Sequence, residues 1–392
     1  MTALLIIIYV SFISLGLPDT ILGSAWPVMQ ESLHAPLALA GYLSMTVTMG
    51  TVISSICCDW AVSKFGTGRV TAVSVIMTAV ALAGFSVSPN AVCLFLCAVP
   101  LGLGAGCVDA ALNNFVALHY EAKHMSWLHC FWGIGASVGP MLVSATLRAG
   151  NSWRSGYGII AGLQAALCVV LIATQRLWRK DGVKTAVEDA AAPKWKRSEL
   201  FRLPGVVPAL AAFTLYSAAE TTTGLWGASY LHQRFAVSAA DAAVTSTVIF
   251  GSMTVGRLLS GFAARRWSDE TLIRIGQTAC LTGAVLTILA PAAWVALLGI
   301  GLMGLGFAPI YPSMLHQTPR RFGAARSQSV MGLEMASAYL GSTCFPPLFG
   351  ILAGRFTTSL YPWYLLALAA AMLVCSEIAG RQLRYKAKQA SN

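Results

Sequence analysis

Residues 91–118 read AVCLFLCAVPLGLGAGCVDAALNNFVAL and contain one charged side chain, that of Asp109. A helix needs about 20 mostly apolar residues to cross the hydrocarbon core of a bilayer, and this stretch exceeds that length. Its apolar residues are continuous and do not alternate with polar ones, so it predicts a membrane-spanning helix and not a strand of a β-barrel.

Eleven more stretches of this kind occur along the 392 residues. The chain is 56% hydrophobic and 10% charged, against about 25% charged in an ordinary soluble domain. This composition excludes a soluble globular protein and a disordered chain, and it predicts an all-α membrane protein. The twelve expected spanning helices cover approximately 3–30, 38–62, 69–88, 91–118, 125–147, 155–177, 206–232, 240–264, 271–291, 294–315, 326–353 and 360–380.

Lysine and arginine residues are concentrated in alternate gaps between these stretches. With both termini inside, 22 of the 26 basic residues fall on the cytoplasmic side and four fall outside. Because cytoplasmic loops carry the excess of positive charge, we expect a multi-pass protein of the plasma (inner) membrane with both termini in the cytoplasm. The net charge of +11 is then a topology signal, and no nucleic-acid partner is expected.

The longest polar stretch divides the chain into two halves with six expected helices each. The halves look like an internal repeat at an offset near 201, which pairs Asp19 with Glu220 and Trp132 with Glu334. Two pseudo-symmetric bundles of one topology predict a cleft between them near the middle of the membrane. The expected parts are an N-terminal six-helix bundle (1–177), a cytoplasmic linker (178–205) and a C-terminal six-helix bundle with a short tail (206–392).

Four acidic residues lie deep in the predicted helices: Asp19, Asp109, Glu220 and Glu334. An Asp at the bilayer centre costs at least about 2.5 kcal/mol on insertion scales, so it normally faces a cavity or a partner. Removal from water favours the neutral form of a carboxyl group. Such a group can take up a proton on one side of the membrane and release it on the other. The alternative for each residue is a neutral carboxyl hydrogen-bonded between helices.

Two pairs of polar or aromatic residues share a helix face in the first half. Asp109 and Asn113 are four residues apart, and a carboxylate beside an amide suits the recognition of hydroxyl groups. His129 and Trp132 are three residues apart. An imidazole titrates near physiological pH, which makes His129 a candidate proton acceptor or ligand contact. The Trp132 ring offers the flat apolar face on which sugars stack. Plain packing remains open for both His129 and Trp132.

Two aromatic residues extend the candidate set into the second half. Trp226 follows Glu220 within two turns, after a Thr-rich segment that can loosen next to a cleft. Tyr311 stands between Pro309 and Pro312, on a segment that the prolines are expected to bend. We expect both rings to line the cleft with the deep acids, and packing is again the alternative.

The stretches CDWAVSKFGTGR (58–69) and GRLLSGFAARR (256–266) resemble the cytoplasmic signature loop of the major facilitator superfamily and its second copy. LPDTIL (17–22) and GAGCVDAALNNF (104–115) resemble helices 1 and 4 of the fucose-permease-like sugar porters within that superfamily. The resemblance implies the major facilitator fold, with roles in proton coupling and sugar recognition for Asp19 and Asp109. In helix 5 this chain has His129 and Trp132 where the fucose permease has Gln and Asn.

The resemblance also implies a gate at the cytoplasmic helix ends, where charges pair when the outward side is open and part when the halves rock. The residues in question are Asp59, Arg69, Arg257, Arg265 and Arg266.

No P-loop, nucleophile elbow or metal-spaced set of His and Cys is present in the sequence, so we expect neither an enzyme nor a metal site nor a cofactor other than the proton gradient. The predicted function is secondary active transport of a small polar solute, a sugar or related polyol, by proton symport with alternating access. Its expected partners are the solute, protons and the bilayer, with the chain acting as a monomer.

Three residues are candidates for proton coupling: Asp19, Asp109 and His129. Eight are candidates for substrate binding: Asp109, Asn113, His129, Trp132, Glu220, Trp226, Tyr311 and Glu334. One alternative is a proton-coupled efflux antiporter for amphipathic compounds, since the GASVGP stretch at 135–140 is similar to one associated with drug antiporters. The other is a membrane sensor that binds solute without moving it.

Overall fold

The computed structural model describes residues 2–120, 122–178 and 197–391. Within these ranges it is almost entirely helical and contains no β-strand. The first half contains α1 (Thr2–Asp19), α2 (Ile21–Ser32), α3 (Leu39–Phe65), α4 (Thr67–Val87), α5 (Ala91–His119), α6 (Ala122–Arg148), α7 (Trp153–Ala173) and α8 (Gln175–Trp178). The second half contains α9 (Arg197–Phe201), α10 (Val206–Phe235), α11 (Ala239–Ala242), α12 (Val244–Ala263), α13 (Asp269–Ile288), α14 (Ala293–Phe322), α15 (Ala324–Arg355), η1 (Thr358–Leu360) and α16 (Tyr361–Ser391).

Among the described residues, eleven spans are long and apolar enough to cross a membrane. The first of them, Ala3–Ser32, contains both α1 and α2 and is interrupted at Thr20. The predicted helix over 206–232 forms as α10 but is not one of the eleven, because Glu220 and the three threonines after it lower its hydropathy. Its 30 residues give about 45 Å, enough to cross a core of about 30 Å. The predicted class, an all-α membrane protein, is confirmed.

The chain divides into two compact units whose boundaries fall inside helices. Unit 1 comprises Met1–Thr185, Gly224–Gly251 and Pro347–Thr358; unit 2 comprises Ala186–Thr223, Ser252–Pro346 and Ser359–Asn392. Parts of α10, α12 and α15 therefore pack with the first half of the chain. The predicted linker over 178–205 lies mostly in 179–196, outside the described residues, so the predicted domain boundaries stay a prediction.

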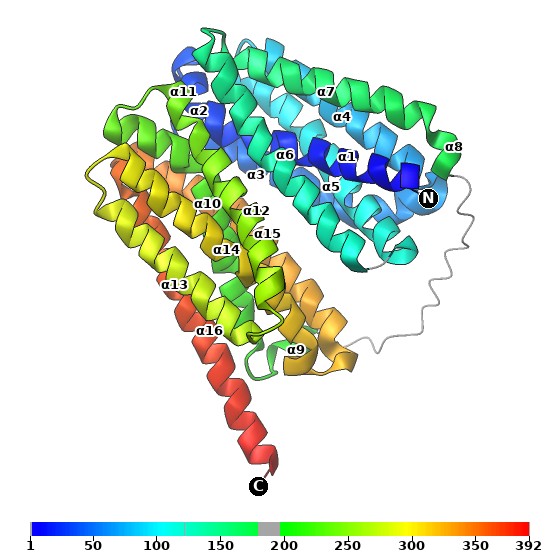
Figure 1. The fold of residues 1–392 in the computed structure, drawn as a ribbon, viewed down its shortest axis with the longest axis vertical. Helices are drawn as coiled ribbons and strands as arrows, with labels where there is room; N and C mark the ends of the chain where they lie inside the picture. Colours follow the sequence, from blue (N-terminus) through cyan, green and yellow to red (C-terminus); the bar gives the residue numbers. More distant parts are fainter. Residues whose placement is uncertain (1, 121, 179–196, 392) are drawn as a thin grey trace. The chain divides into compact units, whose positions relative to one another are not determined.

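Glycines set how closely the helices of unit 1 approach. α1 packs on α6, and α5 packs on both α3 and α4 (Figure 1). At the first crossing a Cβ on Gly135 would collide with the carbonyl oxygen of Ile13, and one on Gly139 with that of Leu17. The small-residue pattern at 135–140 is thus explained by backbone contact between α1 and α6.

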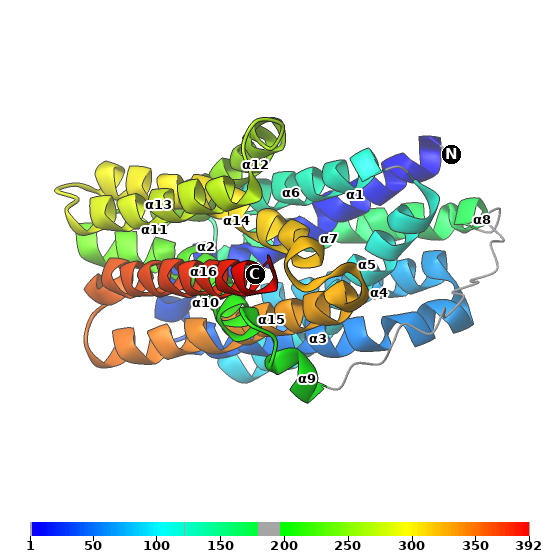
Figure 2. The ribbon, with the colours of Figure 1, turned by 90° about the horizontal axis from the view of Figure 1, so that it is seen from below.

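Unit 2 is built by similar close approaches. α13 packs along α14 and also contacts α16 (Figure 2). Gly276 faces Gly306, and neither has room for a side chain against the other's carbonyl oxygen. Likewise a Cβ on Gly341 of α15 would collide with the carbonyl oxygen of Thr214 in α10.

These crossings fix the register of the internal repeat. Ile13 in α1 corresponds to Thr214 in α10, an offset of 201 that keeps Asp19 opposite Glu220. Gly135 corresponds to Gly341, an offset of 206, so Trp132 corresponds to Ala338. The predicted pairing of Trp132 with Glu334 is therefore wrong by one helical turn, because α15 has four more residues before its contact glycine Gly341 than α6 has before Gly135.

The same reasoning relates α5 to α14. Gly104 approaches the carbonyl oxygen of Ser74 as Gly306 approaches that of Gly276, and both members of the pair are displaced by 202 residues. With this offset Asp109 corresponds to Tyr311.

Segments from both halves of the sequence meet within unit 1 near one end of its helices. Arg148 of α6 donates two hydrogen bonds, of 3.1 and 2.7 Å, to the Asp241 carboxylate. The Ser144 hydroxyl donates to the carbonyl oxygen of Ala240, and that of Thr247 to the carbonyl oxygen of Ser137. In the predicted topology, which stays a prediction, this end lies outside the cell.

Candidate transport site

The α1 break places Asp19 beside Trp132. α1 ends at Asp19, and the Thr20 hydroxyl donates a hydrogen bond of 2.8 Å to the carbonyl oxygen of Ala136 in α6. One turn earlier on α6, the indole N–H of Trp132 donates to the Asp19 carboxylate over 2.8 Å. The Asp19 side chain is nevertheless exposed, although it lies in the middle of the span Ala3–Ser32. The Asp19 carboxylate is therefore not sealed in dry packing.

Asp109 and Asn113 form a second polar pair on α5, as their spacing predicts. The Asn113 amide donates a hydrogen bond of 2.9 Å to the Asp109 carboxylate. The Asn113 Oδ1 is buried and has no hydrogen-bond partner within the described part of the chain. Asp109 also interacts electrostatically with Asp19. We call Asp19, Asp109, Asn113 and Trp132 the α1–α5–α6 cluster; it offers two carboxylates and an amide acceptor that still needs a donor.

Two aromatic contacts surround this cluster. The Trp132 ring is half-buried and meets Phe250 of α12 edge-on, with ring centroids 6.1 Å apart. His129, one turn earlier on α6, is exposed and lies edge-on to the buried Phe12 at 6.1 Å. Of the two predicted residues of α6, Trp132 belongs to the cluster and His129 lies one turn away from Trp132 on the same helix. Phe250 was missed, because nothing in its local sequence indicates a contact with α6.

Unit 2 holds a counterpart around Glu220. This half-buried carboxylate interacts electrostatically with Arg257 of α12 and lies beside the Tyr216 phenol, which is 1% exposed. The Tyr311 ring packs against Tyr216 with centroids 5.8 Å apart. We call Tyr216, Glu220, Arg257 and Tyr311 the α10–α12–α14 cluster. By the repeat register, Glu220 and Tyr311 stand where Asp19 and Asp109 stand in unit 1.

The predicted gate residues differ in their burial. Arg257 lies six residues before the end of α12 and interacts with Glu220, so the structure places it in the interior part of the helix. Arg69 near the start of α4, and Arg265 and Arg266 directly after α12, are exposed. The side chain of Asp59 is outside the described residues. A lone arginine within an apolar run was the sequence signal that could have placed Arg257 at an acidic partner.

Two further predicted binding residues occupy packed positions. Trp226 is 0% exposed; it packs against Phe349, with centroids 5.7 Å apart, and against the backbone side of Gly350. Glu334 is 2% exposed and accepts a hydrogen bond of 2.8 Å from Thr318 near the end of α14. The contacts named here, Phe349 and Gly350 for Trp226 and Thr318 for Glu334, are with residues outside the two clusters.

In the part of the chain that the structure describes, the long apolar helices and the two clusters of polar side chains within them define a polytopic membrane protein of the carrier type. The sequence profile of the Major Facilitator Superfamily matches residues 8–342, and the chain belongs to this family. It is a membrane transporter with the major facilitator fold, and not an enzyme.

The relatives span most of the chain. It is 25% identical to an uncharacterised transporter, y4wD, of Sinorhizobium fredii, with 88% of this chain and 90% of that protein covered. It is 21% identical to the human sodium-dependent glucose transporter 1, over 88% of this chain and 73% of that protein. The crystal structure of the nucleoside transporter NupG is similar with a TM-score of 0.76 at 16% identity, covering 97% and 98% of the two chains.

Proposed function

We propose that this transporter moves a small polyhydroxylated solute, a sugar or a related polyol, together with a proton by alternating access. The main observation in support of this proposal is the α1–α5–α6 cluster, in which Asp109 is hydrogen-bonded to Asn113 and interacts with Asp19. Solute hydroxyls can donate to the orphaned Asn113 Oδ1 and to the carboxylates, which gives the amide the partner that a buried acceptor requires.

The same cluster supplies the chemistry of proton coupling. Because the negative charges of Asp19 and Asp109 repel one another, protonation of either carboxyl group relieves that repulsion. Loss of that proton would place two negative charges beside the bound solute. In this scheme Asp19 and Asp109 carry the coupled proton, with His129 as the third candidate. Proton, and not sodium, as the coupling ion is part of the proposal.

The relatives support the class of solute without fixing it. A glucose transporter is among the similar sequences, and a nucleoside transporter is among the similar folds. Both solute classes present several hydroxyl groups. The ring of Trp132 stands beside the acids, where an apolar sugar face can stack on it.

The sequence argument for the efflux antiporter was the GASVGP stretch at 135–140, and helix packing accounts for this stretch. The glycines at 135 and 139 are required by the backbone contact of α6 with α1, whatever the direction of transport. A non-transporting sensor remains distinguishable by experiment, since it binds solute and shows no counterflow.

The test starts with a thermal-shift screen of the purified protein against D-glucose, D-xylose, L-fucose, sorbitol and uridine. A hit is then followed as a radiolabelled solute in proteoliposomes, under an imposed proton gradient and separately under a sodium gradient. We expect accumulation with the proton gradient alone. Accumulation driven only by sodium, or the absence of counterflow for every hit, would overturn the proposal.

Asp109→Asn sharpens the test, because the amide keeps the shape of the side chain and cannot carry the proton. We expect it to abolish gradient-driven accumulation while counterflow continues. Asn114→Ala is the matched control, since Asn114 is exposed on the same helix and lies outside the cluster. Wild-type accumulation by Asp109→Asn would remove this residue from the mechanism.

A further inference from the structure

The buried side chain of Gln164 in α7 joins α1 to α4 within unit 1. Its Nε2 donates a hydrogen bond of 2.7 Å to the carbonyl oxygen of Ser14, and its Oε1 accepts one of 2.9 Å from the Thr78 hydroxyl. A carbonyl oxygen can only accept a hydrogen bond, so Ser14 determines which way the amide is turned. The amide therefore has one defined orientation between the two helices.

The carbonyl of Ser14 needs this donor because of Pro18. In an α-helix each carbonyl accepts a hydrogen bond from the N–H four residues later, and the residue at that position is a proline, which has no N–H. A buried carbonyl without a donor costs free energy. Gln164 thus supplies from α7 the hydrogen bond that α1 cannot make for itself.

The other side of the α1 break is held in the same way. The Thr20 hydroxyl donates to the carbonyl oxygen of Ala136 over 2.8 Å, and the residue four positions after Ala136 is Pro140. Each of the two bonds therefore goes to a carbonyl that a proline deprives of its usual donor. Asp19 lies between Pro18 and Thr20, so both bonds fix its position.

The corresponding helix of the second half is built differently. With the offset of 201, Pro18 corresponds to Ala219 and Ser14 to Leu215. α10 continues through this position from Val206 to Phe235. Glu220, the counterpart of Asp19, is therefore carried by an uninterrupted helix. The proline and its glutamine donor belong to the helix that carries Asp19.

Gln164 does not reach the solute itself. Its side chain is 2% exposed, and the cavity that it lines with Ser14, Pro18 and Thr78 has a volume of about 10 Å³. A cavity of this size holds about one water. A sugar or polyol does not fit there, so an effect of Gln164 on transport has to be transmitted through α1.

We propose that Gln164 is a positioning residue for proton coupling, which holds α1 at Ser14 so that Asp19 stays beside Trp132 and Asp109. The inference rests on the proposed function, in which Asp19 carries the coupled proton. Gln164 acts on the backbone just over one turn before Asp19 and binds neither the solute nor the proton.

The hydrogen bond is tested first without solute, by the melting temperatures of the wild type, Gln164→Leu, Pro18→Ala and the double variant. Gln164→Leu keeps the volume and leaves the Ser14 carbonyl without its donor, so we expect a loss of about 2–4 °C. Thr78 loses little, since its hydroxyl also lies 2.9 Å from the carbonyl oxygen of Val75.

Pro18→Ala restores a backbone N–H four residues after Ser14. In that background the loss caused by Gln164→Leu should fall below about 1 °C, because the carbonyl has its in-helix donor again. An equal loss in both backgrounds would overturn the inference and leave the proposed function untouched, since no solute enters this measurement.

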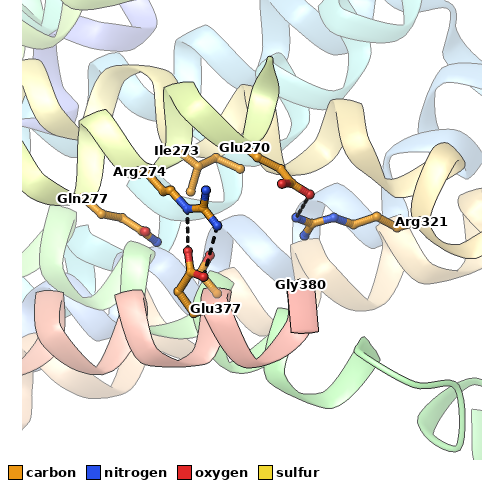
Figure 3. A pocket seen from close by; sticks show the side chains of 8 residues that line it. Glu270, Ile273, Arg274, Gln277, Arg321, Glu377 and Gly380 are labelled. Carbon is orange, nitrogen blue, oxygen red and sulfur yellow. Dashed lines mark hydrogen bonds and ion pairs between the residues drawn. The ribbon is translucent and has the colours of Figure 1, made fainter. Parts of the chain in front are cut away.

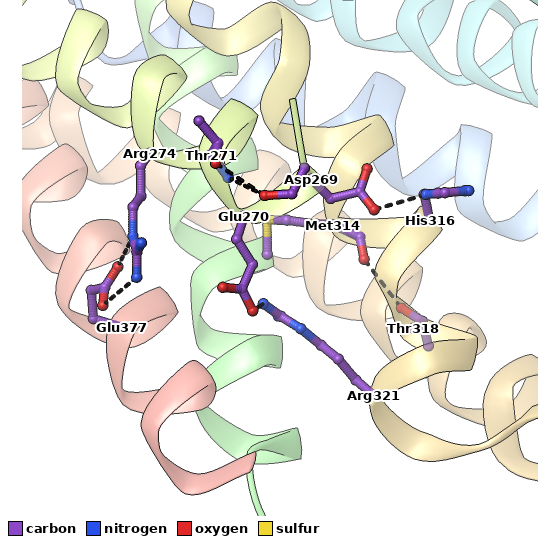
Figure 4. A network of polar contacts seen from close by, with 10 residues as sticks. Asp269, Glu270, Thr271, Arg274, Met314, His316, Thr318, Arg321 and Glu377 are labelled. Atoms are coloured by element: carbon purple, nitrogen blue, oxygen red, sulfur yellow. Dashed lines mark hydrogen bonds and ion pairs between the residues drawn. The ribbon is translucent and has the colours of Figure 1, made fainter. Parts of the chain in front are cut away.

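Gln277→Leu is the matched control, because Gln277 is a buried glutamine of unit 2 whose amide has no hydrogen-bond partner in the described part of the chain. Figure 3 shows it beside the ion pair of Arg274 with Glu377, and Figure 4 shows this pair together with that of Glu270 and Arg321. These pairs do not involve the amide, so the melting temperature should not fall. A fall as large as that of Gln164→Leu would show that any buried amide has this effect, against the inference.

Transport separates a positioning role from plain stabilisation. In proteoliposomes that contain equal amounts of folded protein, we expect Gln164→Leu to lower proton-driven accumulation about tenfold, since a displacement of about 1 Å at a reacting group can cost up to about 100-fold. Counterflow requires no net proton movement and should continue. Equal loss of both activities would contradict a role in coupling.

The double variant Pro18→Ala with Gln164→Leu gives the sharpest outcome. Its melting temperature should recover, whereas its accumulation should stay low, because alanine favours a continuous helix that displaces Asp19. Recovery of both would make Gln164 a purely structural residue and would overturn the inference. Absence of transport by the wild type would count against the proposed function instead.

Discussion

The indole N–H of Trp132 donates a hydrogen bond of 2.8 Å to the Asp19 carboxylate, across the crossing of α1 and α6. This bond holds one acid of the α1–α5–α6 cluster at a fixed place where α1 is interrupted. Gly135 and Gly139 make it possible by allowing the two backbones into contact. The position of Asp19, a candidate proton carrier, thus depends on two glycines of α6 that lie three and seven residues after Trp132.

Trp132→Phe is expected to slow proton-driven uptake about tenfold, because a hydrogen bond to a charged group contributes about 1.5–3 kcal/mol. The phenyl ring keeps the aromatic face and its contact with Phe250, so solute binding in a thermal-shift assay should change less than the rate. The comparison is initial uptake rate against stabilisation by the same solute. An unchanged rate would mean that the hydrogen bond has no part in transport.

Gly135→Ala is expected to lower the free energy of unfolding by about 1–3 kcal/mol, because its Cβ would meet the carbonyl oxygen of Ile13. Gly162→Ala on α7 is the matched control, since a Cβ there meets nothing within 4 Å. That control should stabilise the helix by about 0.5–1 kcal/mol. The readout is the melting temperature of the purified variants. Shifts of the same sign in both would contradict the close crossing.

Much of the architecture could be predicted from residue type alone. Continuous apolar runs and the uneven distribution of Lys and Arg indicate spanning helices however those helices pack. The prediction of an all-α membrane protein therefore did not require knowledge of tertiary contacts. The break of α1 at Thr20 could not be predicted, because it rests on a hydrogen bond to Ala136, more than a hundred residues away. The residues around Thr20 give no indication of this hydrogen-bond partner.

The candidate site shows the same limit. The Asp109–Asn113 bond follows from a spacing of four residues on one helix. In contrast, the partner of Glu220 is Arg257 on another helix, and the burial of Trp226 depends on Gly350. Helical periodicity says which residues share a face. It does not say whether that face meets a cavity or a neighbouring helix.

Arg257→Gln is expected to destabilise the protein by about 1–3 kcal/mol, because the half-buried Glu220 loses its cationic partner. Glu220→Gln in the same chain should recover most of the loss, since it removes the charge left without compensation. Melting temperatures of the two single variants and the double variant test this. If the two losses simply add, the residues do not act as a pair.

The ion pair of Arg148 with Asp241 joins α6 to α11 within unit 1, and its side chains are 57% and 55% exposed. An exposed pair contributes at most about 1 kcal/mol, so Arg148→Asp should scarcely change the melting temperature.

Alternating access requires the outer contacts to part, and the like charges in this variant favour the parted state. A cysteine at Thr247, which donates to the carbonyl oxygen of Ser137, should then react faster with an impermeant maleimide from outside. Arg148→Asp combined with Asp241→Arg restores an attractive pair and should return the labelling rate to that of the parent. Labelling that stays fast in the charge swap would show that the pair does not hold the outer ends of the helices together.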